Sequence, residues 1–192
     1  MLLRNALEMI NRFPTPVCSD DCGDNLPAVA FDDCNPEIND AEIEEIFFTN
    51  KDQPLVDWTS AAEWDGRIDN TAPNPDSILR LCVVGDKPEP TRTEREISKG
   101  RKISGKKDHV VNFEIDETNE TNHEFLRQLE CGAQLKMWYK TSSGLLFGGN
   151  EGIDASVFLD MSIPRSRNEI ITYIGKADWK AKFTEERIDS PI

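Results

Sequence analysis

Three cysteines near the start of the chain have a spacing that could bind a zinc ion. Cys18, Cys22 and Cys34 follow the pattern C-x3-C-x11-C, and zinc sites use three or four thiolate or imidazole ligands. The second pair of ligands that a structural zinc site needs is missing, while Cys82 and Cys131 lie in or beside predicted structured elements. We therefore favour unpaired or core cysteines, keep these three as weak metal candidates, and expect no cofactor.

The aspartates around these cysteines raise calcium as a second possibility. The stretch DDCGDNLPAVAF places its glycine at the fourth position and has no glutamate to close the loop, so it fails the register of an EF-hand. A calcium site with a looser arrangement of ligands is kept as an alternative. It would go with an alternative function, that of a monomeric calcium-dependent binding or adhesion module.

The residue types of nucleophilic and general-base catalysis form no recognisable motif. The two histidines, His109 and His123, have no serine or cysteine partner motif, and neither G-x-S-x-G nor H-E-x-x-H occurs. Paired carboxylates are expected by chance among 36 acidic residues, so they select no catalytic dyad. We expect that the protein is not an enzyme.

The stretch TSSGLLFGGNEG, residues 141–152, is the most motif-like part of the chain. A phosphate-binding P-loop needs a lysine after its last glycine, but Gly148 and Gly149 are followed by Asn150 and Glu151. The dinucleotide-binding pattern is absent too, and the stretch lies between two predicted strands. These glycines are expected to form turns.

The elements around these residues are mostly strands. In DHVVNFEIDE, Val111, Phe113 and Ile115 alternate with polar residues, the period of a half-buried strand. Three later segments alternate in the same way and predict an antiparallel meander with one buried face. Their expected inward residues are Leu135, Met137 and Tyr139; Ala155, Val157, Leu159, Met161 and Ile163; and Ile171, Tyr173, Ala177, Trp179, Ala181 and Phe183.

Further strands and two short helices are expected between these segments. A strand is predicted near residues 46–49, and another has Leu79, Leu81 and Val83 on one face. The first helix has Ser60 and Glu63 at the spacing of a capping box, with Gly66 as its stop. The second has Thr121 and Glu124 at the same spacing, with Gly132 as its C-cap.

The N-terminal region differs from the rest. Leu3, Leu7 and Ile10 recur at helical spacing before Pro14 and Pro16, which predicts a short amphipathic helix followed by an extended arm. The apolar run is too short for a secretion signal or a membrane span. We expect two regions, an N-terminal helix and acidic arm at 1–57 and a β domain at 58–192.

Charge is distributed unevenly along the chain. The net charge is −14, which argues against binding free nucleic acid through counterion release. Residues 18–57 hold twelve acids and one lysine, whereas residues 86–108 hold eight basic residues and five acids. The basic stretch RTEREISKGRKISGKKD reads as a long exposed hairpin. Opposite patches of this kind can meet across subunits and set the register of docking, although two solvated loops would look the same.

Taken together, the pattern from residue 87 to residue 188 resembles the tail-tube-like structural proteins of phages that infect Bacteroidetes, including the ring proteins in the tails of crAss-like phages. The resemblance is carried by the charged hairpin, HVVNFEID, NHEFLRQL, LKMWYKTSSGLLFGGNEGIDASVFLDMSIP and ADWKAKFTEERI. It covers about the C-terminal half of the chain. The acidic segment with three cysteines departs from the pattern and leaves the N-terminal third unassigned.

This resemblance implies a fold, a function and partners. It implies an antiparallel β-sandwich or barrel with one or two flanking helices, in a virion protein that forms a ring or tube segment of a tail. It also implies a ring, six- or twelve-fold, with neighbouring tail or portal-proximal ring proteins, and assembly in the host bacterial cytoplasm. From the charge and the apolar runs we expect neither a membrane nor a specific nucleic-acid sequence as partner. Our own hypothesis is that an acidic channel would let DNA pass without sticking.

The expected functional residues are therefore subunit contacts. The tryptophans Trp58, Trp64 and Trp179 are candidates for core or interface anchors, and core packing is the favoured alternative. The expected interface residues are Leu2, Leu3 and Leu7 in the arm, and Arg92, Arg95, Lys99, Arg101, Lys102, Lys106 and Lys107 in the basic hairpin.

Overall fold

The structure, a computed structural model, describes residues 38–39, 41–97, 101–129, 133–166 and 168–192. Residues 39–192 form one compact unit. The sequence suggested a boundary after residue 57. The compact unit begins earlier, because a strand at residues 43–50 belongs to its central sheet.

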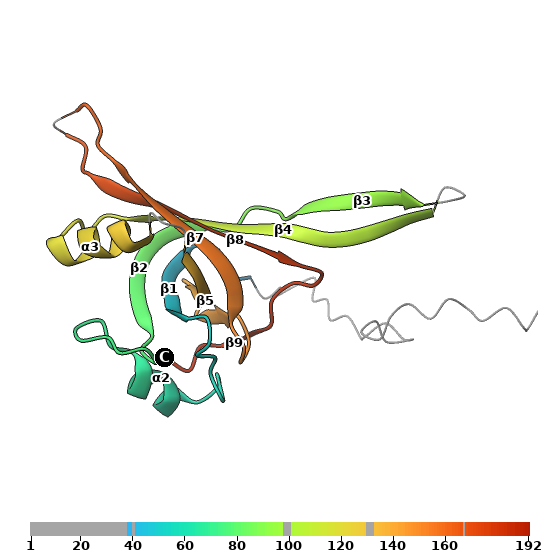
Figure 1. Cartoon of the computed structure of the whole chain (residues 1–192), viewed down its shortest axis with the longest axis horizontal. Coiled ribbons are helices and arrows are strands. Elements are labelled where there is room, and N and C mark those ends of the chain that lie inside the picture. Colours follow the sequence, from blue (N-terminus) through green and yellow to red (C-terminus); the bar gives the residue numbers. More distant parts are fainter. Residues whose placement is uncertain (1–37, 40, 98–100, 130–132, 167) are drawn as a thin grey trace, which may run out of the picture. The chain divides into compact units, whose positions relative to one another are not determined.

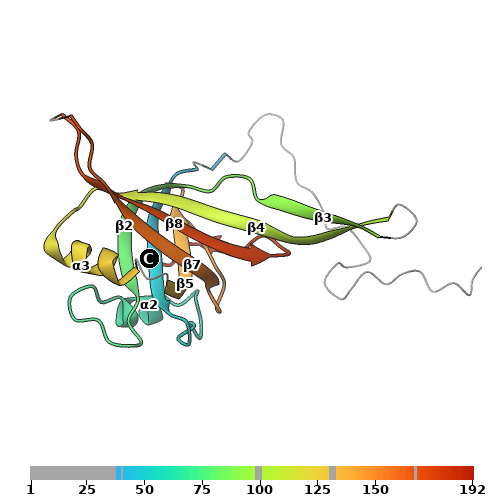
Figure 2. The same ribbon diagram turned by 45° about the horizontal axis from the view of Figure 1, so that its top comes forward.

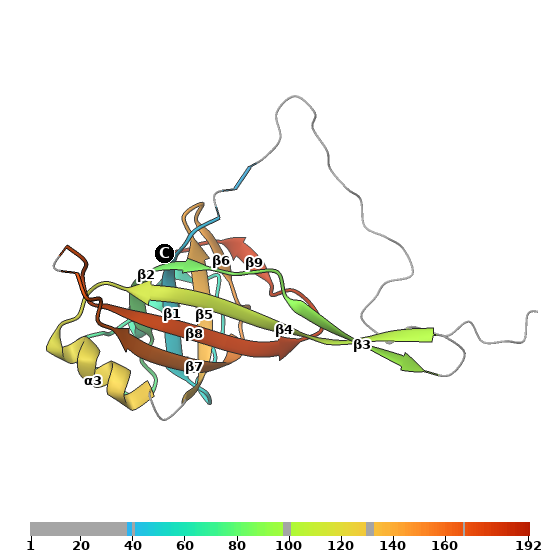
Figure 3. The same cartoon turned by 90° about the horizontal axis from the view of Figure 1, so that it is seen from above.

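Six antiparallel strands close into a barrel (Figures 1 and 3). Its ladder runs β1-β2-β4-β8-β7-β5 and returns to β1, because β1 pairs with both β2 and β5. The mainly β fold is confirmed, and of the two predicted architectures the barrel is the one observed. The strands are β1 (Ile43–Asn50), β2 (Leu79–Asp86), β4 (Arg101–Ile115), β5 (Ala133–Thr141), β7 (Ile153–Ser162) and β8 (Thr172–Ala181).

The barrel interior is filled by the alternating residues that the sequence identified. Val111, Phe113 and Ile115 of β4 are buried, and so are Leu159 of β7 and Tyr173 of β8. Their neighbours on each strand face outward, as the period of two requires. The predicted meander is confirmed, since β5 pairs with β7 and β7 pairs with β8.

A second apolar cluster lies on the other face of β1 and β5. Trp138 was expected to face outward, opposite Met137 and Tyr139, but all three side chains are buried. The reason is that Trp138 and Phe47 pack against Trp64, which belongs to the second cluster. Both strands are therefore covered on both faces, and alternation is lost there.

The first helix, α2 (Ala61–Arg67), carries Trp64 into this cluster. Ser60 caps it as predicted, because its side chain accepts a hydrogen bond from the Glu63 amide. The predicted stop was wrong: Gly66 lies inside the helix, which continues to Arg67 and is capped by Ile68.

The second helix, α3 (Glu120–Leu129), lies at the end of the barrel away from β3 (Figures 1 and 3). Leu126 and Leu129 pack into the main core, with Phe125 partly buried beside them. The expected cap at Thr121 was wrong, since Asn119 accepts the hydrogen bond from the Asn122 amide through its side chain. Gly132 lies outside the described residues.

Three further strands extend the sheet beyond the barrel. They are β3 (Thr91–Ile97), which pairs with β4, β6 (Leu145–Phe147), which pairs with β5, and β9 (Arg187–Asp189), which pairs with β6. The inward pattern expected for β7 and β8 fails at the ends of their segments. Met161, Ile163, Ile171 and Phe183 are exposed, because the chain there has passed beyond the barrel core.

Candidate assembly surface

The basic hairpin expected from the sequence is formed by β3 and the first part of β4. Ile97 pairs with Arg101 at its closed end, and Thr91 pairs with Asp108 at its base. β8 joins β4 only from Lys107 onward, so residues 101–106 have β3 as their strand neighbour. At 3.3 Å per residue these six residues extend about 20 Å beyond β8. Figure 1 shows this hairpin projecting from the barrel.

The hairpin concentrates positive charge. Residues 91–108 hold seven lysines and arginines and three acids. Arg92 lies directly opposite Lys107 in the ladder, and like charges in that position destabilise a strand pair. Arg92 and Lys106 are exposed and Lys107 is half-buried. The structure thus brings these three predicted contact residues together on the described part of the hairpin.

Other predicted contact residues are placed less completely. Arg95, Arg101 and Lys102 lie on the two strands of the same hairpin, where Arg95 pairs with Ile103 and Arg101 with Ile97. Lys99 lies outside the described residues. So do the arm residues Leu2, Leu3 and Leu7, and the weak metal candidates Cys18, Cys22 and Cys34.

The base of the hairpin is fixed to the barrel by a buried carboxylate. Glu185, whose side chain is 4% exposed, forms an ion pair with Lys87 and accepts hydrogen bonds from Tyr139 Oη at 3.3 Å and Trp179 Nε1 at 3.1 Å. These groups come from the end of β2, from β5, from β8 and from the segment after β8. Burial and the Glu185 carboxylate together raise the pKa of Tyr139, so it stays a neutral hydrogen-bond donor.

His109 of β4 lies in the same cluster, two residues from Lys107. Its side chain is fully buried, and its ring stacks on Trp179 at 5.3 Å. Nδ1 is 3.2 Å from a Glu185 oxygen, yet neither ring nitrogen forms a hydrogen bond with a described residue. Burial lowers the pKa of His109, Lys87 and Lys107 act in the same direction, and Glu185 opposes them. The imidazole is therefore neutral at pH 7.

A second carboxylate joins β1 to its two neighbours. Glu45 is buried and forms ion pairs with Arg80 of β2 and Lys140 of β5. Burial tends to raise the pKa of Glu45, but the hydrogen bonds from Arg80 and Lys140 outweigh it and the pKa is lowered. This carboxylate therefore links β1 to β2 and β5, the two strands with which β1 closes the barrel.

The three predicted tryptophan anchors belong to the interior of the fold. Trp64 is fully buried, and Trp58 and Trp179 are 6% and 7% exposed. The Trp64 indole donates to the Trp58 carbonyl at 2.8 Å. None of the three offers a free face, so core packing rather than an interface describes them.

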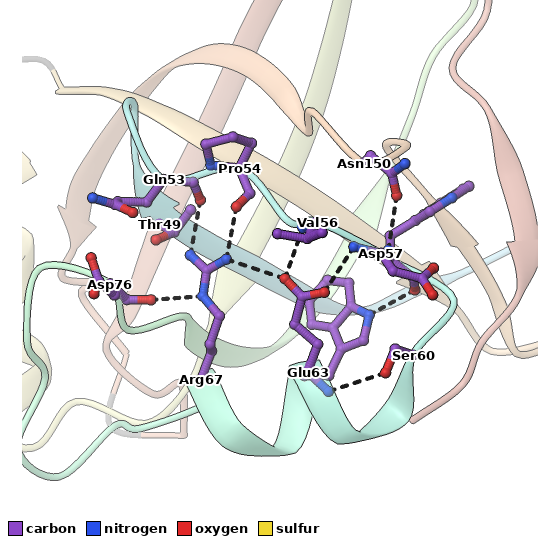
Figure 4. A network of polar contacts seen from close by, with 12 residues as sticks. Thr49, Gln53, Pro54, Val56, Asp57, Ser60, Glu63, Arg67, Asp76 and Asn150 are labelled. Atoms are coloured by element: carbon purple, nitrogen blue, oxygen red, sulfur yellow. Dashed lines mark hydrogen bonds and ion pairs between the residues drawn. The ribbon is translucent and has the colours of Figure 1, made fainter.

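Two charged side chains of α2, Glu63 and Arg67, form a polar brace by hydrogen bonding to backbone groups of the neighbouring loops (Figure 4). Arg67 donates to the backbone carbonyls of Gln53, Pro54 and Asp76, and Glu63 accepts from the amides of Val56 and Asp57 at 2.8 Å. Since both side chains are satisfied by backbone groups, the brace fixes the loop after β1 and has no free group for a ligand.

The glycine-rich stretch makes turns, as predicted. Gly144, Gly148, Gly149 and Gly152 all have positive φ. A Cβ on Gly148 would lie 2.4 Å from the Trp138 ring, and the Trp138 indole donates to the Gly149 carbonyl at 2.7 Å. The stretch therefore serves to seat a tryptophan, a role that the sequence pattern did not indicate.

Metal-ligating side chains do not gather in the described part of the chain. Among those residues no three histidine, cysteine, aspartate or glutamate side chains lie together as metal ligands, and Cys82 is an exposed free thiol. His123 of α3 faces the Tyr173 ring at 6.5 Å. No helix in the described ranges is long and apolar enough to cross a membrane.

The Glu185 cluster was missed by the sequence analysis. Lys87 and Glu185 are 98 positions apart, and the sequence shows only one acid among many. No spacing rule could have joined them. Comparison with known proteins adds no identity: no protein-family model matches this chain, and no curated protein matches it significantly.

Proposed function

We propose that this chain is a structural subunit that assembles with copies of itself into a ring or tube segment, and that the β3–β4 hairpin makes the contact. The observation that carries the proposal is the projection of this hairpin beyond the barrel. An isolated two-stranded ribbon is at best marginally stable in water. A neighbouring copy would supply the support that the barrel does not.

The edge of the hairpin suits such a contact. Within the described chain β3 pairs with β4 alone, so its outer backbone groups are open to strand addition. The opposed cations Arg92 and Lys107 favour an acidic neighbour, and the chain as a whole carries a net charge of −14. Opposite charge on the two partners would set the docking register.

The resemblance to tail-tube-like proteins extends the proposal to a bacteriophage tail. A barrel with a flanking helix and a long charged hairpin fits a subunit of such a ring, which closes when one contact repeats around an axis. The acidic net charge suits a channel that DNA passes without adhering. A ring whose lumen is basic would contradict this last step.

The test is self-assembly of the purified chain. We expect light scattering to give a mass several times 21.7 kDa and negative-stain images to show rings. Combined substitution of Arg92, Lys106 and Lys107 by Glu should reduce the assembly to smaller species. Lys176→Glu is the matched control, because Lys176 is exposed on β8 and away from the hairpin. A chain that is monomeric at every concentration, or equal assembly by both variants, would contradict the proposal.

A further inference from the structure

The connection between β7 and β8 carries exposed apolar side chains. Beyond the last strand pair, Ser162 with Thr172, the chain forms a hairpin tip. Ile163 and Ile170 are 64% and 62% exposed, and Met161 and Ile171 are 45% and 41% exposed. Apolar side chains gathered in this way mark a contact site on a monomer surface. This apolar tip is at the end of the β4–β8 ladder opposite the basic hairpin (Figures 1 and 2).

The apolar tip carries charges of both signs. Arg165 and Glu169 are exposed between the isoleucines, and Arg165 makes no ion pair with any described residue. A surface that matches this tip would combine an apolar floor with an acidic group placed for Arg165.

One groove on the same chain has this character. Two adjoining hollows of about 250 and 280 Å³ lie between α3 and the loop before β2, and both are lined by Pro73, Leu79 and Phe125. Glu124 is exposed at the edge of the second hollow and has no ion pair with a described residue, whereas Arg80 in the same hollow is already paired with Glu45. We call this the α3 groove.

The segment that forms one wall of the α3 groove is acidic. Residues 116–129, which comprise α3 and the chain leading into it, hold four acids and one arginine, and Glu124 is the acid among them that lines the groove. The groove thus offers apolar contact for the isoleucines and negative charge for Arg165. The tip and the groove are complementary in both respects.

The two surfaces cannot meet within one copy. α3 lies between the β7–β8 tip and the loop before β2 in both Figure 1 and Figure 2. One side of the helix places His123 against Tyr173 of β8, while Phe125 and Gln128 line the groove. A contact between two different surfaces of identical chains is head-to-tail, and its repetition builds a ring or a filament.

We propose that the apolar tip of the β7–β8 hairpin of one copy docks in the α3 groove of the next copy, with Arg165 beside the partner's Glu124. This inference rests on the proposed function, because it supplies a second contact for the same self-assembly. It differs from the hairpin contact in chemistry, being mainly apolar.

Charge reversal with rescue tests the pairing. Arg165→Glu and Glu124→Arg should each weaken self-association about tenfold, and the chain with both changes should return to within about threefold of the unmodified chain. Ile163→Asp combined with Ile170→Asp should weaken it more than about a hundredfold. Association constants come from sedimentation at low ionic strength, with Lys176→Glu as the control. All the substituted side chains are exposed, and thermal melting verifies that each variant folds.

The outcomes separate this contact from the basic hairpin. Unchanged association of the Ile163 and Ile170 variant, or failure of the double charge reversal to recover, would overturn the docking of the tip in the α3 groove. If only the Arg92, Lys106 and Lys107 variant loses association, the hairpin contact stands and the tip contact fails; the reverse result overturns the hairpin contact alone. Binding of the tip to phosphatidylserine vesicles, with self-association unaffected by tip changes, would assign it to a lipid surface instead and also overturn the proposal.

Discussion

Replacing Glu185 by Gln should destabilise the barrel more than any other single carboxylate change in the described chain. The carboxylate forms an ion pair with Lys87 and accepts from Tyr139 and Trp179. Gln keeps the shape and one acceptor oxygen but removes the charge, so the Lys87 ammonium loses its counterion. Breaking a buried ion pair costs about 3–5 kcal/mol. Because the Lys87 side chain is 20% exposed, water recovers part of this, and we expect about 2–4 kcal/mol.

The assay is urea denaturation at pH 7, followed by tryptophan fluorescence, because Trp179 belongs to the cluster. Glu186→Gln is the matched control: Glu186 is the next residue and is exposed, so its free energy of unfolding should change by less than about 0.5 kcal/mol. A loss below about 1 kcal/mol for Glu185→Gln, or equal losses for the two variants, would refute the view that this carboxylate fixes the segment after β8 to the barrel.

Three further outcomes follow from the described contacts. Gly148→Ala should lower the free energy of unfolding by about 2–4 kcal/mol, because its φ of +140° and the Trp138 ring at 2.4 Å both oppose a Cβ. Gly144→Ala is the control: Gly144 also has positive φ but lies in open space, so the loss should be about 1 kcal/mol. Equal melting temperatures of the two variants would contradict this. The free energy of unfolding should fall as the pH drops below about 6.5, the ordinary pKa of histidine. His109 has a lowered pKa in the fold, so the unfolded chain binds the proton first. In urea denaturation at several pH values, His109→Gln should flatten this part of the plot of stability against pH. Arg67→Met should lower the free energy of unfolding by about 2–3 kcal/mol, since it leaves three backbone carbonyls without their donor. In the same denaturation assay, Arg67→Lys should restore less than half of the stability that Arg67→Met loses.

Alternation was enough to predict the strands that have one face in the barrel and the other in water. β4 is the clearest case, where Val111, Phe113 and Ile115 face inward. It was not enough where the outer face is covered by another part of the chain. Trp138 looks like an outward residue until Trp64 of α2 is placed against it, and no local pattern specifies that contact.

The ends of elements and the polar cluster depended on information outside any short window. Gly66 stays inside α2 because the helix continues to Arg67, and its C-cap Ile68 forms a backbone bridge with Ile78, just before β2, which a glycine rule does not foresee. The basic hairpin could be predicted because turn residues and charges are adjacent in sequence. The Glu185 cluster could not, since its members come from five separate segments.

The pairing of β1 with both β2 and β5 has a consequence for synthesis on the ribosome. β2 follows β1 closely, but β5 ends at Thr141, some ninety residues after Asn50. At about 5–20 residues per second the interval between them is about 5–20 s. During that time one side of β1, with its apolar residues, lacks the strand that later covers it. The nascent chain therefore has an unpaired strand edge with exposed apolar side chains, which is prone to aggregate unless chaperones cover it or the barrel is completed quickly.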